Sequence, residues 1–179
     1  KDDKKGEVSA IFDDLMGTSI SVRLYDATQE DIDEIERIYA LYSQLTTNFD
    51  RNLFDSNSEY YDLENIYTIN LNRGIKPVTV RKELFDLIQY ALNLVEQTNR
   101  YFNIGIGEAI DIWKEVIESR DLYLDKEITE AEYNNVINNL ATLGQVDLSK
   151  VILDENNLTV YIEDSNVKLD LGAIAKGYA

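Results

Sequence analysis

The N-terminal third of the chain carries a clear pattern of apolar and polar positions. Residues 8–14 and 18–25 predict two strands, the second of which alternates apolar and polar residues, and Gly17 between them permits a turn or bulge. Thr28 and Asp31 have the spacing of a capping box and predict the start of a helix. The apolar residues that follow share one helical face, namely Ile32, Ile35, Ile38, Tyr42 and Leu45.

The central third is predicted to be mostly helical. Residues 46–61 are polar and irregular, which favours a loop, whereas residues 63–70 fit a short helix or a strand. Residues 77–80 lead into a second amphipathic helix, whose inward face comprises Leu84, Leu87, Ile88, Ala91, Leu92 and Val95. Residues 101–106 predict a strand. It precedes a helix with the apolar residues Ile110, Trp113, Val116 and Ile117.

The C-terminal third combines one more helix with strands. Thr129 and Glu132 form another capping-box pattern, and Gly144 is suited to end that helix. Three strands are predicted, at residues 151–153, 158–162 and 167–171. Because helices and strands do not alternate regularly, the sequence predicts an α+β fold. Residues 172–179 have the pattern of a helix start, and since a new helix needs packing partners, we expect a longer domain.

Composition and charge exclude several kinds of function. The 179 residues include 34 acidic and 17 basic ones, no His and no Cys, and the formal net charge is −17. So acidic a surface disfavours nucleic-acid binding. Without His and Cys there is no Ser-His-Asp or Cys-His nucleophile, no His-based zinc site and no disulfide, and a metal would meet oxygen ligands, as Mg²⁺ and Ca²⁺ prefer. No apolar run approaches the roughly 20 residues that span a bilayer.

The most distinctive local sequence is Leu169-Asp-Leu-Gly-Ala-Ile-Ala-Lys-Gly-Tyr178, a predicted strand-to-helix turn rich in small residues. Small residues permit close approach of another group, amide groups at a helix start favour an anion, and Lys176 adds positive charge. Tight packing of the strand against the helix, with Asp170 as a cap and Lys176 in solvent, explains the same residues. From the residues alone, both interpretations stay open.

Three separated segments resemble the ApbE family of flavin transferases, in the same order along the chain. Leu15-Met-Gly-Thr-Ser-Ile-Ser-Val22 resembles the family's N-terminal Met-Gly-Thr strand. Gln97-Thr-Asn-Arg-Tyr-Phe-Asn-Ile-Gly-Ile-Gly107, with Trp113 downstream, is similar to its Thr-x-Gly-x-Phe-Asp block. The segment from Leu169 to Ala179 resembles its Leu-Asp-Leu-Gly-Gly-Ile-Ala-Lys-Gly-Tyr-Ala signature almost position for position.

The resemblance implies an enzyme that cleaves FAD with Mg²⁺ and transfers FMN to a Thr of an acceptor flavoprotein. A Mg²⁺-dependent FAD pyrophosphatase that releases FMN and AMP is one alternative, and a non-catalytic flavin-binding or surface-interaction module is another. The resemblance also implies an exported bacterial lipoprotein at the extracellular face of the cell membrane, with residues 1–7 as a flexible leader. Residues 8–179 are then the N-terminal portion of the family domain, inactive or weakly active without the C-terminal portion.

The resemblance further assigns site residues by position. The positions that match FAD-binding positions of the family are Met16, Tyr101, Phe102, Asn103, Asp170 and Lys176. Ala173 matches a position whose backbone carbonyl binds Mg²⁺, and the family's other metal ligands belong to its C-terminal portion. An aromatic ring at Tyr101 or Phe102 is suited to stack on a flavin or adenine ring, and Lys176 is suited to stabilise charge on a phosphate.

Overall fold

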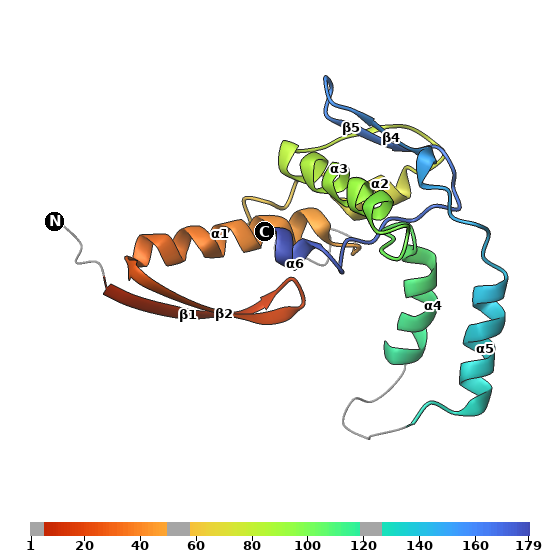
Figure 1. Ribbon diagram of the computed structural model, residues 1–179, viewed down its shortest axis with the longest axis horizontal. Helices are drawn as coiled ribbons and strands as arrows, with labels where there is room; N and C mark the ends of the chain where they lie inside the picture. The colour runs from red at the N-terminus through yellow and green to blue at the C-terminus, as the bar shows by residue number, and fades with distance from the viewer. Residues whose placement is uncertain (1–5, 50–57, 119–126) are drawn as a thin grey trace.

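The computed structural model describes residues 6–49, 58–118 and 127–179, and this part of the chain forms three regions (Figure 1). We call them the hairpin region (residues 6–46), the body (residues 66–97 and 148–178) and the arm (residues 107–141). The hairpin region and the arm extend from the body in different directions. The hairpin region and the arm each have one end beside the body, so segments that are far apart in the sequence lie near one another there.

The hairpin region begins with the two predicted strands, which form a two-stranded antiparallel sheet. β1 (Gly6–Leu15) pairs with β2 (Thr18–Ala27), and Phe12 lies opposite Ile20. β1 starts two residues earlier than the predicted strand and includes residues 6 and 7, which the family resemblance places in a flexible leader. Residues 1–5 of that leader lie outside the described residues. The alternation seen in the sequence thus places one side chain in two against the helix that follows.

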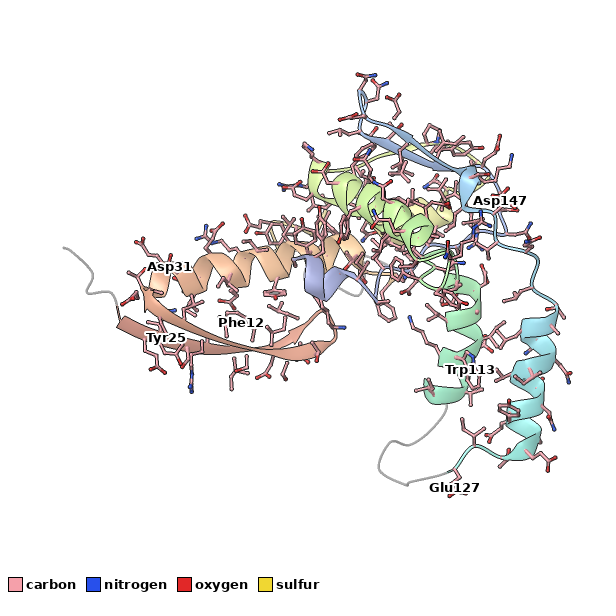
Figure 2. All side chains as sticks on the ribbon, in the orientation of Figure 1. Phe12, Tyr25, Asp31, Trp113, Glu127 and Asp147 are labelled. Carbon is pink, nitrogen blue, oxygen red and sulfur yellow. The ribbon has the colours of Figure 1, made fainter. Side chains whose placement is uncertain are left out.

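That helix is α1 (Gln29–Thr46), which covers one face of the sheet. The backbone N–H of Thr28 donates to the Asp31 carboxylate at 2.8 Å, as the capping-box pattern predicts. Phe12 is only 6% exposed because it lies between the sheet and α1 (Figure 2). Beyond Thr46 the described residues of the predicted loop 46–61 are irregular, and residues 50–57 of that loop lie outside the described residues.

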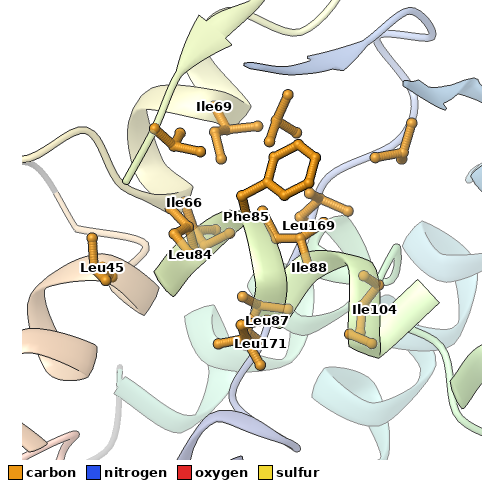
Figure 3. Close-up of a cluster of buried hydrophobic side chains, with 14 of the residues drawn as sticks. Leu45, Ile66, Ile69, Leu84, Phe85, Leu87, Ile88, Ile104, Leu169 and Leu171 are labelled. Carbon is orange, nitrogen blue, oxygen red and sulfur yellow. The ribbon is translucent and has the colours of Figure 1, made fainter. Parts of the chain in front are cut away.

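The body is organised around α3 (Lys82–Gln97), whose buried face comprises Leu84, Phe85, Leu87, Ile88, Ala91 and Val95. This is the face that the apolar spacing predicts, with Phe85 in addition and Leu92 only half-buried. Side chains from other elements complete the core around Phe85, among them Leu169 and Leu171 of the C-terminal signature (Figure 3). The signature segment is therefore part of the core of the body and is fixed by apolar burial.

A short helix and a small sheet enclose the rest of this core. α2 (Ile66–Leu71) resolves the ambiguity of residues 63–70 in favour of a helix, because Asn65 and Thr68 cap its start reciprocally, at 3.1 and 2.8 Å. β3 (Val78–Thr79), β5 (Thr159–Ile162) and β4 (Val151–Asp154) form an antiparallel sheet in that order. A 3₁₀ turn, η2 (Leu148–Lys150), precedes β4.

The arm consists of two predicted helices, α4 (Gly107–Glu118) and α5 (Glu130–Ala141). They contact each other, and the rings of Trp113 and Tyr133 lie 6.5 Å apart. Trp113 is labelled on α4 in Figure 2. Trp113 thus packs within the arm, half-buried, and not in the core of the body. α5 ends at residue 141, before the predicted end at Gly144.

Residues 101–106 do not form the predicted strand. Asn99 and Arg100 adopt left-handed backbone conformations, with φ of 49° and 66°, and reverse the chain directly after α3. The Asn103 side chain then accepts a hydrogen bond from the Gly105 backbone N–H at 2.8 Å, which favours a turn. Within the described part of the chain, the β-bridge of this segment is a single parallel one between Ile106 and Lys168.

The predicted strand at residues 167–171 is also wrong. Apart from the bridge at Lys168, no neighbouring strand pairs with it in the described part of the chain. Its backbone bonds go elsewhere, because Leu169 N–H donates to the Asn70 side chain and Asp170 N–H donates to the Ile104 carbonyl, both at 2.8 Å. The segment ends in the single helical turn α6 (Ala175–Tyr178).

Helices packed against antiparallel strands confirm the predicted α+β class. Among the helices that the structure describes, none is long and apolar enough to cross a membrane.

Candidate functional site

A cavity of about 350 Å³ lies where the three regions meet. Its walls come from the turn between β1 and β2, from the end of α1 and the residues after it, from α4 of the arm, and from the signature segment. Three of the predicted site residues, Met16, Asp170 and Lys176, line this cavity. The first and third of the segments that carry the family resemblance therefore meet at one place, although most of the chain separates them.

The turn that contributes Met16 has an unusual backbone. Asp14, Met16 and Gly17 all have positive φ, of 62°, 52° and 66°. Left-handed conformations at non-glycine residues cost of the order of 1 kcal/mol each and persist only where neighbouring contacts enforce them. One such contact is a hydrogen bond of 3.1 Å from the Met16 backbone N–H to the Ser43 hydroxyl of α1. The hairpin tip is thereby held against α1 with Met16 at the cavity.

Asp170 is oriented by a chain of amide side chains. Asn70, buried in α2, donates to the Asn48 side-chain oxygen at 2.8 Å and to the Leu169 carbonyl at 2.9 Å. The Asn48 amide in turn donates to one Asp170 carboxylate oxygen at 2.9 Å. The other carboxylate oxygen accepts from the Gly172 backbone N–H at 2.8 Å. Both oxygens of Asp170 are thus positioned by bonds that originate in the body.

The backbone amides of the signature segment are largely engaged within the segment itself. Gly172 N–H bonds to Asp170, and the N–H groups of Ile174 and Ala175 both donate to the Leu171 carbonyl, at 3.0 and 2.9 Å. The helical turn α6 is only four residues long. The sequence interpretation in which amides at a helix start attract an anion therefore receives little support, and positive charge at this cavity comes from lysine side chains.

Among the described residues, four charged side chains line the cavity: Asp14, Asp170, Lys114 and Lys176. Lys114 projects from α4, and its ammonium lies 5.5 Å from the centre of the Phe49 ring, which also lines the cavity. Phe49 is about half exposed and is the aromatic side chain at this wall. An aromatic face and ammonium groups beside one cavity can bind a ligand that combines a flat ring with anionic groups.

Three other predicted residues lie elsewhere. Tyr101 is 96% exposed, Phe102 packs against the core of the body, and Asn103 stabilises the turn before α4. None of them is among the described residues that line the cavity. The structure therefore brings Met16, Asp170 and Lys176 together but leaves the block at residues 101–103 apart from them.

Ala173 faces a different, shallower cavity of about 390 Å³, which it lines together with Tyr90 and Tyr178. The Tyr178 ring also contacts Tyr42, at 5.8 Å between ring centres. Burial raises the pKa of Tyr42, and the neighbouring Tyr178 raises it further. This second cavity is thus walled mainly by aromatic and small residues.

The described residues do not fit a magnesium site by themselves. No group of three or more His, Cys, Asp or Glu side chains lies close enough to hold a metal within residues 6–49, 58–118 and 127–179. A lone backbone carbonyl, such as that of Ala173, supplies one of the six oxygen ligands that Mg²⁺ requires. We therefore derive no chemical step through a metal from these residues.

Several residues at the cavity were not predicted. Ser43, Asn48, Phe49 and Lys114 come from segments whose pattern indicates an amphipathic helix face or a loop. A related residue, Asn70, does not line the cavity but orients Asp170 through Asn48. It carries a signal in the sequence, because it is a polar residue in a mostly apolar stretch and a buried amide needs hydrogen-bond partners. Ser43, Asn48, Phe49 and Lys114 carry no such signal in their local sequence.

Comparisons with known proteins identify the family of this chain and several relatives. The profile of the ApbE family matches residues 16–179. The chain is 29% identical over 164 residues to an FAD:protein FMN transferase of Klebsiella pneumoniae (strain 342), covering 92% of this chain and 45% of that protein. It is 25% identical over 171 residues to an FAD:protein FMN transferase of Treponema pallidum (strain Nichols), covering 92% of this chain and 42% of that protein.

One solved structure shares the fold. It is the crystal structure of the ApbE protein from Thermotoga maritima MSB8, with a TM-score of 0.63 and 22% identity, covering 96% of this chain and 49% of that one. The chain spans about half the length of the proteins that it matches.

Proposed function

This chain belongs to the ApbE family, and we propose that it contributes part of the FAD site of an enzyme that transfers FMN from FAD to a Thr of an acceptor flavoprotein. The observation that carries the proposal is the meeting of Met16, Asp170 and Lys176 at one cavity. These residues come from two segments that resemble the family, at opposite ends of the chain. Two relatives named FAD:protein FMN transferase support the same substrate and reaction class.

In the proposed reaction, the bond between the FMN phosphorus and the bridging oxygen of FAD breaks. A bond forms between that phosphorus and the Thr hydroxyl oxygen, AMP leaves with the bridging oxygen, and the hydroxyl proton is released. Negative charge grows on the departing phosphate, and the exposed Lys176 ammonium is placed to stabilise it. Asp170, fixed by Asn48 and Gly172, is placed to accept a hydrogen bond from a hydroxyl or amine of the ligand.

The family resemblance extends the proposal to a requirement for Mg²⁺ and to a bacterial protein exported to the extracellular face of the membrane and anchored there by a lipid. The roles given above to Lys176 and Asp170 do not depend on the ion. They depend on the cavity and on the contacts that hold its walls.

The test compares two proteins: this chain alone, and this chain joined to the part of the Klebsiella pneumoniae relative that it does not match. We expect calorimetry with FAD and Mg²⁺ to detect clearly tighter binding by the joined protein. In that protein, Lys176→Gln should weaken FAD binding about tenfold, since a charge-assisted hydrogen bond contributes roughly 1.5–3 kcal/mol. Lys76→Gln, at an exposed position away from the cavity, is the matched control.

The reaction itself is read by mass spectrometry of an acceptor protein incubated with the joined protein and FAD. Transfer adds the mass of one FMN moiety to the acceptor, and Thr→Ala at the modified position abolishes the gain. Release of AMP without a mass gain supports the pyrophosphatase alternative. Absence of FAD binding by the joined protein contradicts the proposal and leaves a surface-interaction module as the better interpretation.

A further inference from the structure

Two lysines from distant parts of the chain line the cavity of about 350 Å³ and form no salt bridge with a described carboxylate. Lys114 lies in α4 and Lys176 in α6, and neither forms a salt bridge with any residue that the structure describes. Acidic residues outnumber basic ones two to one, and ion pairs form readily on this surface. Arg23, Arg37, Arg73, Arg81, Lys82, Lys150 and Lys168 all have carboxylate partners. Lys76 and Arg100 also form no salt bridge with a described residue, but they do not line this cavity. Lys114 and Lys176 differ from them because they face one cavity together.

The placement of Lys114 is enforced by the root of the arm. Glu108 pairs with Arg73 of the body at 2.7 Å, and Asp111 pairs with Lys168 of the segment that leads to the signature. These two contacts fix how α4 is rotated. Because residues three apart share a helix face, Lys114 lies on the same side as Asp111 and is turned toward the body.

Close packing at Gly107 fixes the distance between α4 and the body. Its backbone N–H donates to the Lys168 carbonyl at 2.9 Å, and a Cβ atom at position 107 would lie only 2.8 Å from that carbonyl oxygen. Only a glycine permits this approach without a shift of the backbone. The first turn of α4 is thus set against the segment that continues into Asp170 and Lys176.

Neither lysine forms a salt bridge with Asp14 or Asp170, the carboxylates that line the cavity among the described residues. Both oxygens of Asp170 already accept hydrogen bonds, from Asn48 and Gly172. Lys114 instead lies over the Phe49 ring, a weaker partner than a carboxylate. A half-buried ammonium that faces a cavity and has no salt-bridge partner among the described residues is suited to an anionic ligand.

We propose that Lys114 is a second phosphate-binding residue, which acts with Lys176 to hold a diphosphate group in this cavity. The inference rests on the proposed function, because the pyrophosphate of FAD is the diphosphate that such an enzyme meets. It adds to that function by giving the arm a direct part in ligand binding. α4 contributes a charge to the ligand as well as packing against the body.

The experiment uses the 179-residue chain and inorganic pyrophosphate at low ionic strength. Binding is followed through the NMR signals of the lysine ε-methylene groups, which report each ammonium separately. We expect the signals of Lys114 and Lys176 to shift with one common affinity and that of Lys76 to stay constant. Lys114→Gln should weaken binding about tenfold, whereas Lys114→Arg should retain most of the affinity. Lys76→Gln should leave it unchanged.

Each outcome either supports or overturns the inference. A structural role for Lys114 predicts lower thermal stability in Lys114→Gln, whereas a ligand-binding role predicts thermal unfolding that matches that of Lys76→Gln. Absence of pyrophosphate binding, or equal binding by Lys114→Gln and the unaltered chain, overturns it. Failure of the proposed function gives a different result. In that case pyrophosphate binds to the chain through Lys114, but the joined protein does not bind FAD. If the joined protein binds FAD and Lys114→Gln has no effect there, only the present inference fails.

Discussion

The body and the arm are built from similar amphipathic helices but are held in place differently. α3 of the body buries six apolar side chains in a core shared with several other elements. In the arm, Val136 is the only apolar side chain that is buried among the described residues. The arm is joined to the body mainly through two ion pairs and the close contact at Gly107.

This difference indicates which region contributes most to the free energy of unfolding and which can open locally. Apolar burial contributes roughly 25 cal/mol per Å² and is not subject to charge screening. The ion pairs of the arm have side chains that are 22–38% exposed, and such pairs contribute about 1 kcal/mol or less and weaken with salt. We therefore expect the body to unfold as the global cooperative unit and the arm to open locally at lower free energy. A ligand that contacts Lys114 would then stabilise the arm more than the body.

Phe85→Ala should have the largest effect. Phe85 is 1% exposed at the centre of the body, and its truncation leaves a cavity that lowers the free energy of unfolding by about 4 kcal/mol. Urea denaturation followed by circular dichroism measures this loss. Ile117→Ala, at a half-exposed position in the arm, is the control and should change stability by less than about 0.5 kcal/mol. Similar losses for both variants would contradict the comparison.

Polar contacts should also differ between the two regions. Asn70→Ala removes the partners of the buried Leu169 backbone N–H and carbonyl, so we expect a loss of about 2–3 kcal/mol. Asp111→Asn weakens an ion pair whose two side chains are 38% and 22% exposed, and should cost about 1 kcal/mol or less. Denaturation at low and high salt measures both changes. Only the Asp111→Asn difference should shrink at high salt.

A matched pair of valines compares the two regions directly. Val95 in α3 is 2% exposed and Val136 in α5 is 1% exposed, so Val→Ala removes the same buried atoms from each region. Each change should cost about 2 kcal/mol locally. Amide hydrogen exchange should show faster exchange throughout the body for Val95→Ala. For Val136→Ala the acceleration should be confined to α4 and α5, and its spread to α3 would mean that body and arm unfold together.

The smallest effect concerns a surface charge at the start of α3. A hydrogen bond from Arg81 holds the pKa of the Glu83 carboxyl below its ordinary value. A lowered pKa stabilises the fold above the unfolded-state value, and that contribution disappears as the pH falls through the folded-state value. Glu83→Gln should therefore reduce the pH dependence of the free energy of unfolding below about pH 5. The change should be well under 1 kcal/mol, because the Arg81 and Glu83 side chains are 45% and 34% exposed and solvent screens the pair.

Glu96→Gln is the control for that measurement. Glu96 lies on the same helix and forms no salt bridge with the described residues. Stability followed by urea denaturation from pH 3 to pH 7 should show a larger change in slope for Glu83→Gln than for Glu96→Gln. Equal slopes would mean that the Arg81–Glu83 pair makes no contribution to stability.

Much of the local structure could be predicted because short-range rules decide it. Apolar spacing predicted the buried face of α3, and the capping pair at Thr129 and Glu132 is present, with the Glu132 backbone N–H donating to the Thr129 hydroxyl at 3.2 Å. The strands predicted at residues 101–106 and 167–171 were wrong for a shared reason. The buried residues of the two segments, Ile104, Val167, Leu169 and Leu171, pack against the body. Their apolar pattern therefore indicated burial, although neither segment forms a paired strand.

The candidate site divides in the same way. Asp170 and Lys176 lie within one continuous motif, and their proximity follows from the sequence. Asn48 and Lys114 lie in segments without any motif, and they reach the cavity only because α1 and α4 end or begin beside the body. Residues 101–103, which the family resemblance placed in the site, are not among the described residues that line the cavity. They follow two left-handed residues that reverse the chain after α3.

By itself, the sequence determined the charge of −17, the exclusion of His and Cys chemistry, the amphipathic helices and the membership of a family. These properties depend on residue types and on spacings of a few positions, which short-range physics is enough to interpret. Only the tertiary structure decided that Met16, Asn48, Lys114 and Asp170 line one cavity. Their convergence depends on how three regions pack around a shared core, and burial acts between residues that are distant in sequence.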